Sequence, residues 1–156
     1  MSYLKTDDYK AGLKRFLRAL EIDPFNPEAL YLTAVCYFQN KQYDNCIKFS
    51  KKCVMFDNKK IDCYKLICES YFNLDNKDEC LKLYEKYYAI SKNNWRYLYS
   101  WGLALQKYGN YNKSVDIFDL AIDLNHDDYN LYIALANSYL LLDNFELARD
   151  AVKKSI

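Results

Sequence analysis

A pattern of about 34 residues repeats along the whole chain, and it constrains the fold more than any other feature of the sequence. Small residues recur at this interval in two sets of positions. The first set is Ala34, Cys68, Gly102 and Ala136, and the second is Gly12, Cys46, Cys80, Ser114 and Ala148. Two largely aromatic sets accompany them: Tyr3, Tyr37, Tyr71, Leu105 and Tyr139, and Tyr9, Tyr43, Lys77, Tyr111 and Phe145. A fixed period of this length is typical of solenoids, in which neighbouring units of secondary structure stack to bury a continuous core.

Within each copy, core residues follow helical spacing. Leu30, Thr33, Ala34 and Tyr37 lie at positions i, i+3, i+4 and i+7, which forms one stripe of an amphipathic helix. The chain has only two prolines and three glycines, so few residues interrupt such helices. We therefore predict an all-α fold with helices near 9–22, 27–40, 43–56, 61–74, 77–90, 95–108, 111–124, 129–142 and 145–156.

Polar residues mark the starts of several of these helices. Asp8, Asn76, Asn110 and Asn144 directly precede second helices, where a side-chain oxygen can accept hydrogen bonds from the unpaired amides of the first turn. Asn26 and Pro27 open another helix, with proline at a first-turn position that tolerates it.

The small positions, the flanking aromatic residues and the helix spacing together resemble tetratricopeptide repeats (TPRs), and the likeness covers essentially the whole chain. The resemblance implies antiparallel helices A and B in each repeat, stacked as a right-handed superhelix. The single array would span 1–156, with repeats at about 1–26 (partial), 27–60, 61–94, 95–128 and 129–156 (partial). The last helix is not followed by a polar closing helix, so we expect a longer array, a partner that covers the ends, or self-association through them.

Charge and cysteine content narrow the class of protein. The net charge is +1 and the lysines occur as isolated pairs, so we expect no nucleic-acid partner. The sequence shows no export signal and no membrane-spanning stretch, so we expect a cytoplasmic protein without a membrane partner. The six cysteines form no Cys-x-x-Cys pair, and four fall in small-residue positions of the repeat, which indicates reduced thiols in the core. A disulfide framework and a zinc site are the alternatives.

Motifs of catalysis are missing from the sequence. We find no glycine-rich phosphate loop, no Gly-x-Ser-x-Gly and no His-Glu-x-x-His. His126, beside Asp127 and Asp128, is the single histidine, and an exposed position in a turn explains it better than a role as general base. We therefore expect a protein that is not an enzyme and that needs neither a cofactor nor a metal.

The TPR resemblance implies that the A helices line a concave groove. Its candidate binding residues lie beside the core positions and are mostly apolar, without an obvious structural role. They are Tyr31, Val35, Phe38, Lys65, Phe72, Arg96, Tyr99, Leu103, Ile133, Asn137 and Leu140. Lys65, Arg96 and Asn137 would fix the orientation of a partner. The alternative is that neighbouring helices or a terminal segment cover these residues.

The function implied is that of a protein-interaction scaffold, part of a larger assembly, which binds a partner peptide or helix through apolar anchors. The second interpretation is a dedicated cytosolic chaperone. Trp101-Gly102-Leu103-Ala104 and Gly109-Asn110-Tyr111 resemble the repeats of type III secretion class II chaperones, which hold apolar segments of client proteins.

Overall fold

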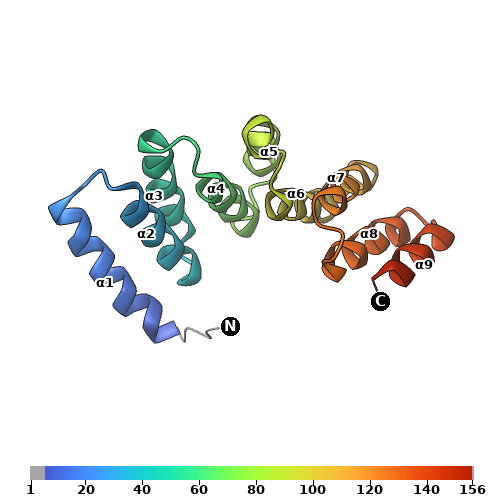
Figure 1. Cartoon of the computed structure of the whole chain (residues 1–156), viewed down its shortest axis with the longest axis horizontal. Coiled ribbons are helices and arrows are strands. Elements are labelled where there is room, and N and C mark those ends of the chain that lie inside the picture. The colour runs from blue at the N-terminus through green and yellow to red at the C-terminus, as the bar shows by residue number, and fades with distance from the viewer. Residues whose placement is uncertain (1–5, 156) are drawn as a thin grey trace. The chain divides into compact units, whose positions relative to one another are not determined.

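The computed structural model describes residues 6–155, and this part of the chain forms nine α-helices (Figure 1). They are α1 (Thr6–Ile22), α2 (Pro27–Gln39), α3 (Tyr43–Phe56), α4 (Ile61–Asn73), α5 (Lys77–Ser91), α6 (Trp95–Lys107), α7 (Tyr111–Leu124), α8 (Tyr129–Leu141) and α9 (Phe145–Lys154). The all-helical prediction is confirmed, and eight of the nine helices start at the predicted residue. Tyr3 and the other predictions for residues 1–5 and 156 lie outside the described residues.

The first helix is longer than predicted. It begins at Thr6 rather than at residue 9, so Asp8 lies inside the first turn and the prediction that it precedes the helix is wrong. Hydrogen bonds between backbone groups decide where a helix begins, and a residue type that often precedes a helix does not by itself mark its first residue.

Three of the other predicted caps form and one does not. Asn26 Oδ1 accepts from Ala29 N at 2.9 Å, with Pro27 in the first turn of α2. Asn76 and Asn144 cap α5 and α9 in the same way, at 3.2 and 3.3 Å. Asn110 precedes α7 without a side-chain capping hydrogen bond, so that prediction is wrong. Its backbone carbonyl instead accepts the first bond of the helix, from Ser114 N.

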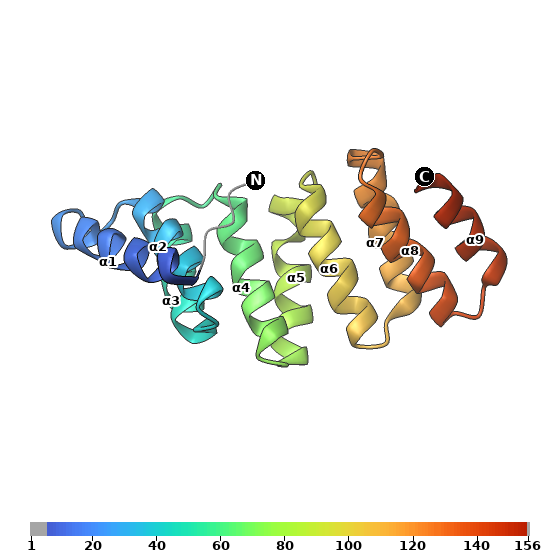
Figure 2. The ribbon, with the colours of Figure 1, turned by 90° about the horizontal axis from the view of Figure 1, so that it is seen from below.

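The A helices α2, α4, α6 and α8 end in the same turn. Lys41, Asp75, Gly109 and Asp143 all have positive φ, between 56° and 83°. In the first of these turns, Gln42 N donates to Tyr37 O at 2.9 Å and Lys41 N donates to Phe38 O at 2.9 Å. Equivalent bonds close the other three turns. This is the Schellman arrangement, which satisfies the last carbonyls of a helix and reverses the chain. In the pairs α2–α3, α6–α7 and α8–α9, it places the B helix antiparallel to the A helix (Figure 2).

The contacts group the chain into two compact units, Met1–Glu79 and Cys80–Ile156. In the first unit, α2 packs against α1 and α3, α3 packs against α4, and α2 also touches α4. In the second unit, α6, α7, α8 and α9 pack in the same sequential manner, and α6 also touches α8. Sequential antiparallel pairs with contacts between successive A helices form a TPR-like solenoid. The single array over 1–156 stays a prediction.

The small positions lie at the close approaches between helices, as predicted. Ala34, Cys46, Cys68 and Cys80 are buried, and Gly12 is half-buried. At Gly102, an added Cβ would lie only 2.3 Å from the Phe118 ring, so this position of α6 leaves no room for a side chain. All six cysteines are buried and none forms a disulfide, so their predicted packing as small core residues is confirmed. Burial raises the pKa of the Cys80 thiol to about 12.

Candidate partner-binding surface

The predicted groove residues of α2 are largely packed against the core of the first unit. Tyr31 is half-buried against the cluster formed by Leu30, Cys53 and Cys63. Val35 and Phe38 are also half-buried, and they pack on the neighbouring cluster that contains Ala34. The expectation that these three side chains have no structural role is therefore wrong. These apolar side chains pack against the small residues of the core beside them.

Two contacts hold this part of the α2 face in place. The Lys60 ammonium lies 4.8 Å from the centroid of the Tyr31 ring, within the range of a cation–π interaction. Burial, followed by the nearby charge of Asp62, raises the pKa of the Tyr31 hydroxyl. The Phe38 ring meets the Tyr43 ring edge to face at a centroid distance of 5.5 Å.

The predicted residues of α4 also have interactions within the first unit. Lys65 Nζ lies 2.8 Å from Glu69 Oε1, one turn further along the same helix. Phe72 is half-buried near the end of the helix. A partner that used the Lys65 charge would have to replace an existing ion pair, whose value at a partly exposed position is small.

The face of α6 in the second unit is packed in a similar way. Tyr99 and Leu103 are half-buried against the cluster that contains Phe118, and the Tyr99 and Phe118 ring centroids are 6.2 Å apart. Burial, followed by the charge of Asp128, raises the pKa of Tyr99. Arg96 is exposed, with its guanidinium 4.5 Å from the centroid of the Trp95 ring. Tyr99 and Leu103 thus have a packing role that the sequence did not indicate.

Helix α8 differs, because its face carries large apolar side chains in contact with solvent. Tyr129 is 57% exposed, Ile133 42%, Leu140 47% and Leu141 50%. They follow one another at helical spacing along one face, with the exposed amide of Asn137 between them. We call these five residues the α8 stripe. The sequence prediction named Ile133, Asn137 and Leu140 but missed Tyr129. The signal for a wider stripe was that α8 is apolar on nearly every side, which is unusual for a surface helix.

A buried polar network fixes α8 on the helices beneath it. Gln106 Nε2 of α6 donates to Ala134 O at 2.7 Å and to Ser138 Oγ at 2.6 Å. Ser138 Oγ also lies 2.7 Å from Ser114 Oγ of α7. Bonds in a buried network are costly to break, because each would leave a polar group without a partner. The α8 stripe is therefore held on a rigid support.

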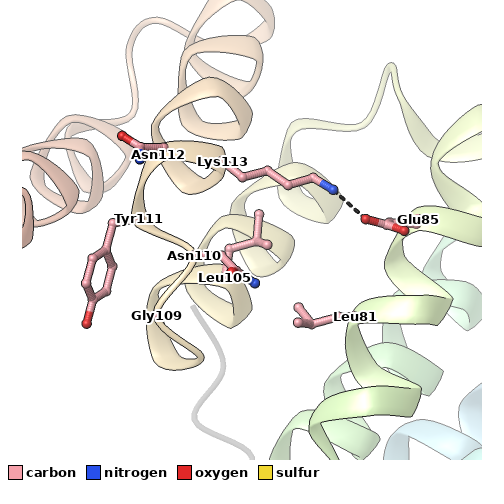
Figure 3. Close-up of a pocket in the computed structure, with 8 residues that line it drawn as sticks. All are labelled: Leu81, Glu85, Leu105, Gly109, Asn110, Tyr111, Asn112 and Lys113. Atoms are coloured by element: carbon pink, nitrogen blue, oxygen red, sulfur yellow. Dashed lines mark hydrogen bonds and ion pairs between the residues drawn. The ribbon is translucent and has the colours of Figure 1, made fainter.

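The turn between α6 and α7 borders a pocket of about 420 Å³ (Figure 3). Lys113 extends across it to form an ion pair with Glu85 of α5, and the Tyr111 ring points away from Leu81. Both charged side chains are solvent-exposed. Because the lysine charge is already compensated, the pocket offers no strong electrostatic site for a small anion.

Residues 6–155 contain no group of three or more histidine, cysteine, aspartate or glutamate side chains placed to hold a metal. His126 is exposed in the turn between α7 and α8, with Nε2 3.6 Å from Asp127 Oδ1, which confirms the predicted turn position. No helix in this range combines the length and the apolar character that a membrane span requires.

Comparisons with known proteins agree with this architecture. A crystal structure of MamA matches with a TM-score of 0.83 at 19% identity, over 96% of this chain and 87% of that one. A thermophilic TPR protein of Thermus thermophilus matches with a TM-score of 0.77 at 22% identity, over 96% and 82%. MamA 41-end from Desulfovibrio magneticus RS-1 matches with a TM-score of 0.82 at 16% identity, over 95% and 84%. At these identities the likeness establishes the fold.

The sequence itself matches a family model over residues 5–87, which is more than half of the chain. The model is described as "Anaphase-promoting complex, cyclosome, subunit 3". The matched range covers nearly all of the first unit and most of α5. The chain therefore belongs to this family of tetratricopeptide-repeat proteins, whose fold is a scaffold for protein–protein interaction.

Proposed function

We propose that the chain binds a partner protein through the A-helix face of its second unit, with the α8 stripe as the main contact. The observation that carries this proposal is the exposure of Ile133, Leu140 and their apolar neighbours on a helix fixed by buried hydrogen bonds. Contiguous exposed apolar side chains on a rigid support are typical of interaction sites. The chain would act by binding rather than by catalysis.

The partner segment would be an amphipathic helix or extended peptide with two or three large apolar side chains. Ile133 and Leu140 lie two helical turns apart, so they would contact anchors at similar spacing on the partner. Asn137 between them would hydrogen-bond a polar group of the partner and so fix its register. Arg96 is exposed at the start of α6 and would add an orienting charge. Tyr99 and Leu103 would contribute mainly by supporting this surface.

The corresponding face of the first unit would play a secondary part. Tyr31, Val35, Phe38, Lys65 and Phe72 are only half-exposed, so each offers less apolar area to a partner than the α8 stripe does. Membership in a family described as a subunit of a complex supports a role within a larger assembly. Six buried thiols without a disulfide fit a reducing compartment, and we place this role in the cytoplasm.

A dedicated chaperone for apolar client segments is the second candidate. The same observation favours it, because a client whose apolar segment must be kept from aggregating would also bind at the α8 stripe. The two functions differ in what the partner needs. A chaperone client would aggregate when the α8 stripe is disrupted, whereas an assembly partner would stay folded and only dissociate.

The proposal can be tested by affinity capture from the source cell with quantitative mass spectrometry. The full chain would be compared with the variant Ile133→Glu/Leu140→Glu and with the control Met55→Glu. Met55 is 76% exposed and lies on α3, so the control changes an apolar surface residue in the other unit. We expect partners that the wild-type and control chains retain and the α8 variant loses. Equal capture by all three chains would contradict the proposal.

A further inference from the structure

A small pocket lies in the second unit, where α7, α8 and α9 meet. It has a volume of about 140 Å³. The buried residues Leu135 and Ala151 line it, together with the half-buried rings of Tyr132 and Tyr139. The exposed carboxylate of Asp119 on α7 belongs to its lining as well. We call this site the α7–α9 pocket, and the α8 stripe is made of other residues.

The pocket lies where other repeats have a large apolar side chain. The residues equivalent to Ala151 in the three preceding repeats are Phe49, Leu83 and Ile117. In the first unit, the Phe49 ring packs on two core clusters and stacks on the Tyr37 ring at a centroid distance of 5.3 Å. The second unit has a tyrosine at the position of Tyr37 too, but alanine takes the place of its aromatic neighbour. The α7–α9 pocket is therefore the space that a ring occupies in the first unit.

An A helix that follows a B helix leaves this side of the B helix open. Asp150 and Lys154 of α9 line the pocket and are exposed. Their equivalents on α7 are Asp116 and Leu120, which remain exposed although α8 follows α7 and packs against it. The accessibility of the pocket thus follows from the packing of the repeat and does not depend on what comes after α9.

The α7 side of the pocket is acidic. Asp116, Asp119 and Asp123 are all exposed and lie three and four residues apart, which places them on one face of α7. Burial, followed by the charges of Asp123 and Asp116, raises the pKa of the Asp119 carboxyl, and the positive charge of Lys154 opposes this shift. A cation of a ligand beside Asp119 would reduce the repulsion among these carboxylates. The charge of the pocket therefore favours a basic ligand.

We propose that the α7–α9 pocket binds a phenylalanine side chain of a partner protein, with a lysine or arginine next to it in the partner sequence that pairs with Asp119. A cavity of about 150 Å³ holds a benzene ring, so the volume suits one aromatic ring. The rings of Tyr132 and Tyr139 offer aromatic contacts to it. This site goes beyond the α8 stripe and shares no residue with it, so either site can fail its test alone.

The probe is the acetylated and amidated peptide Gly-Lys-Phe-Lys-Gly, titrated into the full chain labelled with ¹⁵N. Amide chemical shifts in heteronuclear NMR spectra measure its affinity and its place of binding. We expect saturable shifts around Tyr139 and Ala151. The peptide with alanine in place of phenylalanine should bind at least about tenfold more weakly, because it buries no ring. The peptide with two glutamates in place of the lysines should bind about fivefold more weakly, because its charges are repelled by the carboxylates of α7.

Variants of the chain locate the site. Ala151→Phe introduces the residue type of Phe49 and should weaken binding at least about tenfold, because the new ring fills the pocket. Ala151→Leu introduces the residue type of the third repeat and serves as a second test if Ala151→Phe does not fold. Asp119→Lys should remove or invert the preference for the lysine peptide over the glutamate peptide. Ile133→Glu/Leu140→Glu, which disrupts the α8 stripe, should leave the affinity within about twofold.

The proposal is overturned if the phenylalanine peptide produces no saturable shifts, or if the alanine or the glutamate peptide binds equally well. It is also overturned if a folded variant with the pocket filled at Ala151 binds as the wild-type chain does, or if the α8 variant is the one that loses binding. The dispersion of the amide signals verifies that each variant is folded.

Discussion

Helices α2 and α8 occupy the same place in their repeats, one in each unit, yet they present different surfaces. Tyr31, Val35 and Phe38 of α2 are half-buried on the core, and Lys60 lies over the Tyr31 ring. The equivalent residues of α8, Ile133, Asn137 and Leu140, are exposed. The repeat position thus determines where a residue lies on its helix, but it does not determine which residues its side chain contacts. The size of the side chain and the neighbouring cations decide whether it packs or remains available to a partner.

The two units also differ in how an A helix approaches its B helix. In the first unit, Ala34 of α2 corresponds to Gly102 of α6, and Ser50 of α3 corresponds to Phe118 of α7. The second unit therefore combines the smallest residue on one helix with a large ring on the other, while the first unit uses two small residues. Because protein interiors are closely packed, a substitution that one of these approaches tolerates should destabilise the other.

The largest expected effect is at this approach. Gly102→Leu should lower the free energy of unfolding by about 1–3 kcal/mol, because even its Cβ would overlap the Phe118 ring. Urea denaturation measures the change. Gly12→Ala is the matched control, and it should raise the stability by about 0.5–1 kcal/mol, since the Cβ fits and alanine favours the helix. Equal stability of Gly102→Leu and the wild-type chain would show that α6 does not lie against Phe118.

A second prediction compares two equivalent buried serines. Ser138→Ala should cost about 1–3 kcal/mol, because it removes a partner from both Gln106 and Ser114. Ser70 occupies the same repeat position in the first unit, where the side-chain partner of its hydroxyl is the weakly polar Cys46 thiol. Ser70→Ala should therefore change the stability by less than about 0.5 kcal/mol. Thermal and urea unfolding of the two variants give the comparison, and equal losses would contradict it.

The turns at the ends of the A helices give a third and smaller contrast. The first unit has Lys41 in the left-handed conformation where the second has Gly109. A side chain at such a φ is strained, so Lys41→Gly should stabilise the chain by about 0.5–1 kcal/mol and Gly109→Ala should destabilise it by about 1 kcal/mol. Differential scanning calorimetry measures both shifts. Shifts of the same sign in the two variants would be inconsistent with a shared turn.

The helices could be predicted from the sequence because the same pattern of residues occurs in each repeat and indicates the same pair of helices each time. Small residues at Ala34, Cys46, Cys80 and Gly102 can be recognised from spacing alone, and all are buried. The individual caps were less predictable, since Asn110 has the right residue type and makes no side-chain bond. Whether a capping hydrogen bond forms depends on the backbone geometry of each turn. The residue type alone does not specify that geometry.

The candidate site was harder to predict than the fold. Sequence position placed Tyr31, Tyr99 and Ile133 on equivalent faces, but of these three only Ile133 is exposed, at 42%, whereas the two tyrosines are half-buried. Exposure depends on which residues of the next helix lie within reach, such as Lys60 beside Tyr31 and Phe118 beside Tyr99. These contacts join residues about 20 to 30 positions apart, and the period alone does not specify them.

The smallest expected effect on stability belongs to the α8 stripe, and it is also the most direct test of the account. Ile133→Ser/Leu140→Ser should leave the urea midpoint nearly unchanged, because both side chains are more than two-fifths exposed. Isothermal titration with the purified partner segment from affinity capture should show its affinity for this variant reduced about 30-fold, which corresponds to about 2 kcal/mol of lost apolar burial. Undiminished affinity in a chain of unchanged stability would contradict the claim that this exposed face of α8 receives the partner.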